Sequence, residues 1–77
     1  MSPSGMKKYA VIIEAGPHNF SAYVPDLPGC IAAAGTLEET KQLIAEAIEF
    51  HLEGMAEAGE PIPEPSTVTA MVEVQAA

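Results

Sequence analysis

Hydrophobic and polar positions follow two different spacings along the chain, and the changes in spacing predict its elements. The stretch Lys7–Ala15 is apolar on both faces in its middle, which is typical of a strand inside a sheet. Turn residues Gly16–Asn19 separate it from Phe20–Val24, where apolar and other residues alternate as in a second, antiparallel strand. The prolines of Pro25–Gly29 interrupt the pairing, and Cys30–Ala34 is predicted to resume it as a third strand.

A helical spacing replaces the alternation after Thr36. Thr36 followed three residues later by Glu39 is the pattern of a capping box, so a helix is predicted to begin here. Gly59 and the prolines behind it predict its end near Ala58. One helix face is mainly apolar, comprising Leu37, Lys41, Ile44, Ile48, His51, Leu52 and Met55. The opposite face is mainly acidic, comprising Glu38, Gln42, Glu46, Glu49, Glu53 and Glu57.

A period of two returns over Thr67–Val74 and predicts a fourth, half-buried strand. A helical crossover usually returns the chain to the sheet parallel and right-handed, so we expect this strand to lie parallel to the first. The predicted class is therefore α+β, with the order β-β-β-α-β. A single helix covers one face of such a sheet, which leaves apolar side chains of the first strand for another covering surface.

Length and composition indicate one small domain. The chain has 77 residues, of which residues 1–5 are predicted to form a flexible tail and residues 6–77 a single domain. Its longest apolar run is far shorter than the roughly 20 residues of a membrane span. One cysteine and no apolar signal segment favour a reducing, cytoplasmic location. A net charge of −8 disfavours direct binding to nucleic acid.

Candidate chemistry is sparse. A metal-dependent nuclease of ribonuclease H type would need converging carboxylates, for which Glu14, Glu46 and Glu73 are the candidates, but their predicted positions favour solvated side chains. Neither His18 nor His51 has a partner in a recognisable motif, and Cys30 is interpreted as a small buried residue. The glycines form no phosphate-binding pattern. We therefore predict no catalysis, no cofactor and no metal ion.

Two helix features favour binding to other polypeptides. Leu43, Ala47 and Phe50 form a second apolar stripe beside the first, which predicts a homo-oligomer, because one sheet contact does not need so wide an apolar arc. The acidic ridge, defined as Glu38, Glu39, Glu46, Glu49, Glu53 and Glu57, is explained by solubility alone but also suits a basic protein partner.

Five ordered segments together resemble the antitoxins of the HicB family. They are Lys7–Ile13, Tyr23–Cys30, Gly35–Thr40, Glu46–Glu49 and Gly59–Pro65, and the similarity extends from Met6 to Val74. The resemblance implies a partial ribonuclease-H-like fold without nuclease activity. It also implies that the domain binds and masks a HicA-type toxin, a small basic ribonuclease that cleaves messenger RNA. Fuller family members carry a C-terminal DNA-binding module, which is not expected in a chain ending soon after Val74.

The residues expected to contact the toxin come from two places. Four belong to the segment after the second strand, namely Tyr23, Asp26, Leu27 and Pro28. Three belong to the acidic ridge, namely Glu46, Glu49 and Glu53. The alternatives are a degenerate metal-dependent nuclease or a solitary oligomeric module with another role.

Overall fold

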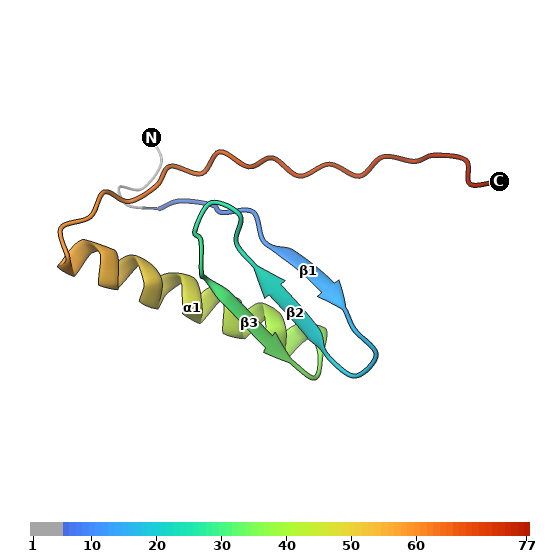
Figure 1. Ribbon diagram of the computed structural model, residues 1–77, viewed down its shortest axis with the longest axis horizontal. Coiled ribbons are helices and arrows are strands. Elements are labelled where there is room, and N and C mark those ends of the chain that lie inside the picture. Colours follow the sequence, from blue (N-terminus) through green and yellow to red (C-terminus); the bar gives the residue numbers. More distant parts are fainter. Residues whose placement is uncertain (1–5) are drawn as a thin grey trace.

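The computed structural model describes residues 6–77, so the predicted tail over residues 1–5 lies outside the described residues. Three short strands and one helix follow one another along the chain: β1 (Ile12–Ala15), β2 (Phe20–Tyr23), β3 (Ile31–Ala34) and α1 (Leu37–Glu57) (Figure 1). The strands form an antiparallel sheet in the order β1-β2-β3. The predicted α+β class, with three antiparallel strands followed by one helix, is confirmed.

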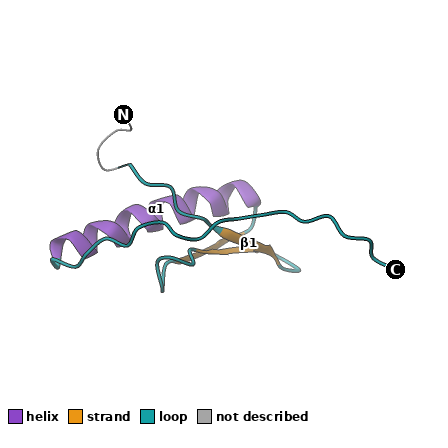
Figure 2. Ribbon diagram, turned by 90° about the horizontal axis from the view of Figure 1, so that it is seen from above, coloured by secondary structure: helices purple, strands orange, loops and turns teal. Residues whose placement is uncertain are grey.

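Helix and sheet form two layers, with α1 packed on β2 and β3 (Figure 2). Alternation decides which side chains lie between the layers, since successive residues of a strand point to opposite faces. The row Ile13–Ala22–Ala32 faces the helix, whereas the neighbouring row Ile12–Tyr23–Ile31 faces away from it. Small alanine side chains on the inner face leave room for the helix to lie close to the sheet.

The core consists of residues from the sheet, the β2–β3 loop and the helix. Its buried apolar members are Ala22, Val24, Leu27, Cys30 and Ile44. Thr40 is buried completely beside them, although its polarity gave no sign of this in the sequence. Its hydroxyl donates a 2.8 Å hydrogen bond to the carbonyl oxygen of Thr36, which removes the cost of burying an unpaired polar group.

Both predicted ends of the helix are confirmed. The hydroxyl oxygen of Thr36 accepts a 3.1 Å hydrogen bond from the amide of Glu39. At the other end, Gly59 adopts a φ of 74°, and the amides of Gly59 and Glu60 donate to the carbonyls of Ala56 and Met55. These two bonds form a Schellman motif, whose left-handed residue is most easily glycine.

The first strand is shorter than its sequence predicted. Only Ile12–Ala15 pairs with β2, whereas residues 7–11 are extended without strand pairing. Hydrophobicity identified the region correctly, but β2 ends opposite Ile12, so the earlier residues have no neighbour on that side. Among residues 6–77, no helix is both long and apolar enough to cross a membrane.

The predicted fourth strand over Thr67–Val74 does not form in the described chain. The chain from Pro61 onward is extended, but it runs past the start of β1 and beyond the body of the protein (Figure 1). Extended conformation is a local property, whereas a strand also needs a neighbour with which to share main-chain hydrogen bonds. The four-stranded β-β-β-α-β arrangement expected from the sequence is therefore absent from residues 6–77.

Candidate partner-binding surfaces

The candidate contact residues lie on opposite layers of the molecule. Tyr23 is 44% exposed on the sheet face turned away from α1, in the row with Ile12 and Ile31. The exposed side chains of Glu46, Glu49 and Glu53 belong to α1, on the other layer. The sequence placed both groups in one partner contact, but the fold separates them.

The loop between β2 and β3 contributes less surface than expected. Leu27 is fully buried in the core, and its amide and carbonyl hydrogen-bond to Val24 and Cys30 within the loop. Gly29 closes the loop with a φ of 85°. Leu27 is the hydrophobic anchor of the loop, so the side chain of Leu27 is not on a surface that a partner could contact. Pro28, in contrast, is exposed.

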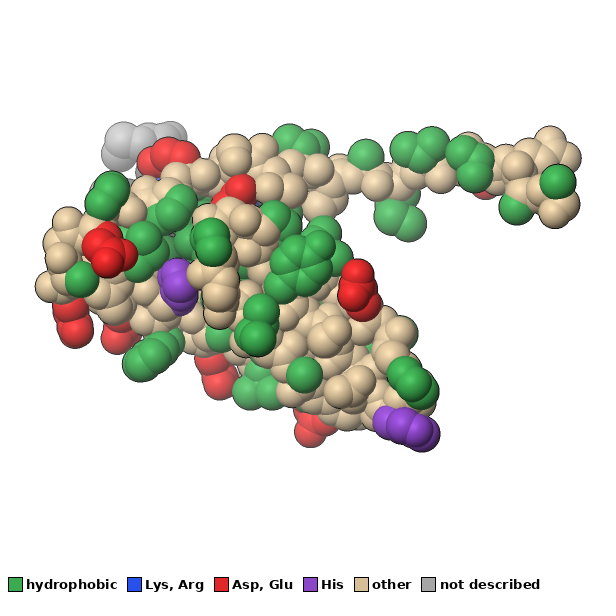
Figure 3. Space-filling view, viewed as in Figure 1, with side chains coloured by type: hydrophobic (Ala, Val, Ile, Leu, Met, Phe, Trp, Pro, Cys, Tyr) green, Lys and Arg blue, Asp and Glu red, His purple; other side chains and the backbone are tan. Residues whose placement is uncertain are grey.

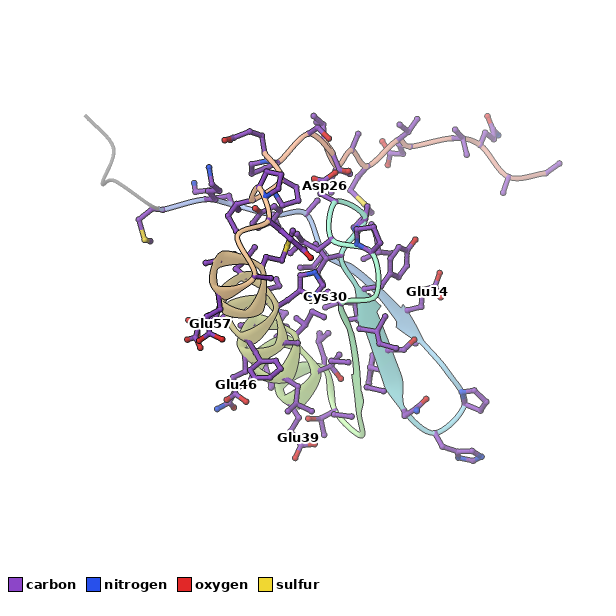
Figure 4. The ribbon with its side chains drawn as sticks, turned by 60° about the vertical axis from the view of Figure 1, so that its left-hand side comes forward. Glu14, Asp26, Cys30, Glu39, Glu46 and Glu57 are labelled. Atoms are coloured by element: carbon purple, nitrogen blue, oxygen red, sulfur yellow. The ribbon has the colours of Figure 1, made fainter. Side chains whose placement is uncertain are left out.

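Asp26 is occupied by the C-terminal segment of the same chain. Its carboxylate accepts hydrogen bonds from the amides of Ser66 and Thr67, both at 3.0 Å, and from their hydroxyls at 3.0 and 2.8 Å. These bonds, led by the Thr67 amide, lower the pKa of Asp26 from 3.8 to about 2. The residue predicted to contact a toxin therefore fastens residues 66 and 67 to the β2–β3 loop (Figure 4).

The acidic ridge divides into two sides. Glu39 and Glu46 line a hollow on the β3 side of the helix together with Leu43 and Ala34. Glu49 and Glu53 line a different hollow that also includes Lys7. Figure 4 shows Glu39, Glu46 and Glu57 along the helix, and Figure 3 shows acidic side chains over it with almost no basic ones on that face. Apolar side chains border both hollows: Leu43 lies beside Glu46, and Leu52 and Ile62 lie beside Glu49 and Glu53.

The second apolar stripe borders the same side of the helix. Phe50 is 79% and Leu43 42% exposed, whereas Ala47 is half-buried and packs against the core. A further hollow contains Ala47 and Phe50 from the helix together with Ile31 and Glu60. One hollow includes Ile31 and the other Ala34, the two ends of β3, and both combine apolar and acidic side chains.

The carboxylates considered for a nuclease do not converge. Glu14 lies on β1, Glu46 on α1 and Glu73 in the extended C-terminal segment. Among residues 6–77 there is no group of three or more His, Cys, Asp or Glu that could hold a metal ion. Cys30 is buried, and its burial raises the pKa of the thiol, which disfavours the reactive thiolate.

Residues 9–76 match the family described as the HicB-like antitoxin of bacterial toxin–antitoxin systems. The chain belongs to this family. A solved structure titled "HicA3 and HicB3 toxin-antitoxin complex" contains a chain of similar fold, with a TM-score of 0.67 and 30% sequence identity. The similarity covers 78% of the present antitoxin-family chain and 70% of the solved one.

Sequence relatives of this HicB-like chain come from a phage, a bacterium and an archaeon. An uncharacterized 14.9 kDa protein of Haemophilus phage HP1 is 40% identical over 78% of the chain, which spans only 45% of the phage protein. A UPF0150 protein of Synechocystis is 33% identical over 82% of the chain and 81% of its own length. A UPF0150 protein of Archaeoglobus fulgidus is 40% identical over 60% of the chain and 68% of its own length.

Proposed function

We propose that this HicB-like domain binds a small basic toxin of the HicA type in the cytoplasm and inactivates it by covering its active surface, without a reaction of its own. The observation that carries the proposal is the 30% identical chain of similar fold in a structure titled as a HicA–HicB complex. The net charge of −8 complements a basic partner, because opposite charges accelerate encounter and disfavour wrong partners.

The β3 side of α1 is the surface that suits this partner best. It combines the exposed side chains of Phe50 and Leu43 with the carboxylates of Glu39 and Glu46. Exposed aromatic and aliphatic side chains provide the buried centre of an interface, and surrounding charges provide its polar rim. The sequence assigned Leu43, Ala47 and Phe50 to self-association, but the carboxylates beside them would repel a second copy with the same charge.

Tyr23 and Pro28 remain candidates for a separate toxin contact. Both side chains are exposed, Tyr23 on the open sheet face and Pro28 on the neighbouring loop. A partner that reached them as well as Glu46 would have to extend around one edge of the sheet. We therefore assign the first contact to the β3 side of the helix.

Binding to the product of the neighbouring reading frame tests this proposal. The full chain is co-expressed with any small basic protein encoded beside it, and the complex is measured by titration calorimetry. We expect the Glu39→Lys/Glu46→Lys double variant to weaken binding at least ten-fold, with the largest loss at low salt. We expect Phe50→Ala to weaken it by at least ten-fold as well, mainly through faster dissociation.

Glu14→Lys provides the matched control, because Glu14 is exposed on β1, on the far side of the sheet from the ridge (Figure 4). It adds the same charge per site and should leave affinity nearly unchanged. Equal affinity in all variants would refute the assigned surface, and failure of any basic neighbour to bind would refute the antitoxin role.

Cleavage of RNA by the purified chain with Mg²⁺ or Mn²⁺ would favour a nuclease. If Phe50→Ala abolished a homo-oligomer, the stripe of Leu43, Ala47 and Phe50 would be assigned to self-association instead.

A further inference from the structure

The C-terminal segment, defined as residues 67–74, has the properties of a strand but lacks a neighbour. Val68 is 88%, Met71 100% and Val72 78% exposed. Apolar side chains stand out along the projecting chain in Figure 3. Within residues 6–77, the segment forms no ladder with any strand. An extended, apolar stretch with unpaired main-chain groups is a strong template for pairing with another strand.

A free strand edge is available on β1. Its residues Ile12–Ala15 pair with β2 on one side, and no described strand lies on the other. Val11, Ile12 and Ile13 line a groove whose opposite wall is the stretch 67–71 of the same chain, so the segment passes this edge without pairing with it. The protein therefore carries both an unpaired strand-like segment and an unpaired strand edge.

The Asp26 contacts fix where the segment starts. They fix Ser66 and Thr67 on the β2–β3 loop, at the point where β1 begins. No glycine or proline follows Pro65, and the next residues include the β-branched Val68 and Thr69, which favour continued extension over a reversal. In Figures 1 and 2 the segment accordingly leaves the body of the protein instead of turning along β1.

We propose that two copies of this chain exchange these segments, so that residues 67–74 of each copy pair with the free edge of β1 in the other. Every copy carries one donor strand and one acceptor edge, which allows a closed two-fold dimer. The exchange also shields the apolar side of the segment formed by Val68, Ala70, Val72 and Val74.

Charge favours a second copy at this place. Each copy has a net charge of −8, so two copies can associate stably only where few of these charges meet. Glu73 is the one charged residue after Glu64, and Glu14 is the one charged residue of β1. The segment and its acceptor edge are thus among the least acidic parts of the molecule, whereas the helix carries most of the acidic ridge.

Proline scanning of the full chain tests the exchange. Light scattering at high micromolar concentration should give twice the 8.0 kDa chain mass for the unaltered protein. Ala70→Pro removes a main-chain donor in the middle of the segment, and should raise the dimer dissociation constant at least ten-fold. Ala76→Pro makes the same change beyond the segment and should leave the dimer intact. Both variants should retain the helical circular dichroism, since Ala70 and Ala76 are exposed and lie after the helix.

Isotope-filtered NMR on a mixture of labelled and unlabelled copies then separates exchange from pairing within one chain. We expect contacts between residues 67–74 of one copy and residues 12–15 of the other. A monomer at high micromolar concentration would overturn the proposal, as would equal dissociation constants for the two proline variants. Contacts confined to single copies would also overturn it, by showing that the segment closes on its own sheet.

Discussion

The helix–sheet body and the C-terminal segment are held by different forces. In the body, Leu27 and Ile44 are buried between layers that cover each other, so removal of apolar surface from water stabilises the arrangement. The chain between Glu60 and this segment is attached by polar contacts, from Lys7 to Glu64 and from Tyr9 to the carbonyl of Pro63, and by the half-buried side chain of Ile62 beside Leu52. Ser66 and Thr67 then donate hydrogen bonds to Asp26. Beyond Thr67 the segment has no such contact among the described residues.

This difference separates a packed body from a projecting segment, the part that we propose to pair with a second copy. The buried apolar residues of the core all belong to β2, the β2–β3 loop and α1. Polar contacts in turn fix where the C-terminal segment starts, but they leave its main-chain hydrogen-bonding groups beyond Thr67 unpaired. Substitutions in the two regions should therefore have separable effects.

The largest effect is expected in the core. Ile44→Ala removes a side chain that is 3% exposed and leaves a cavity between helix and sheet, so the free energy of unfolding should fall by about 3 kcal/mol. Urea denaturation followed by circular dichroism measures this change. Leu43→Ala, one residue earlier and 42% exposed, is the matched control and should cost less than about 1 kcal/mol. Similar losses in both variants would contradict the assigned core face.

A smaller loss is expected at the start of the helix. Thr36→Ala removes the hydroxyl that accepts the amide hydrogen of Glu39, so the free energy of unfolding should fall by about 1 kcal/mol. The same denaturation experiment measures it. Thr36→Ser retains a capping hydroxyl and should recover most of the loss, whereas Ser and Ala variants of equal stability would show that the cap contributes nothing.

Substitution of Asp26 should affect the segment but hardly change the body. Asp26→Asn removes the negative charge and one of the two acceptor oxygens that bind Ser66 and Thr67. We expect the amides of these two residues to exchange hydrogen at least ten-fold faster, with the urea midpoint nearly unchanged. Glu60→Gln neutralises an exposed carboxylate that has no such bonds and serves as the control. Unchanged exchange at both amides would show that other contacts hold the segment.

Acid should release the same contact. The pKa of Asp26 is lowered from 3.8 to about 2 in the folded chain, chiefly by the Thr67 amide. The stabilisation is therefore fully present above pH 3.8, and it is lost as the pH falls through about 2. The amide chemical shifts of Ser66 and Thr67 should titrate with that low midpoint. A midpoint near 3.8 in the native protein would indicate that the carboxylate is not engaged in solution.

The smallest effect is expected at the Lys7–Glu64 ion pair. The side chain of Glu64 is 81% exposed and that of Lys7 28%, so solvent and salt screen their 3.0 Å contact. Lys7→Gln should lower the free energy of unfolding by no more than about 0.5 kcal/mol at physiological salt. Lys8→Gln is the control for loss of one positive charge nearby. A loss above 1 kcal/mol specific to Lys7 would mean that the segment is held more strongly than its polar contacts indicate.

Local sequence patterns determined the elements and both helix ends. Alternation identified Phe20–Tyr23, helical spacing identified Leu37–Glu57, and Thr36 and Gly59 marked the ends, since each signal depends on neighbours within a few residues. The family resemblance could also be predicted, because its five segments are contiguous in sequence. The net charge of −8, which motivates the proposal of a basic partner, follows from composition alone.

Tertiary structure decided which of these residues meet. It buried Leu27 and Thr40, occupied Asp26 with the C-terminal segment, and placed Tyr23 and Glu46 on opposite layers. It also left Thr67–Val74 without the neighbour that its period of two had implied. The physical reason is that periodicity sets the direction of each side chain relative to its own backbone, whereas burial and pairing depend on segments far away in sequence.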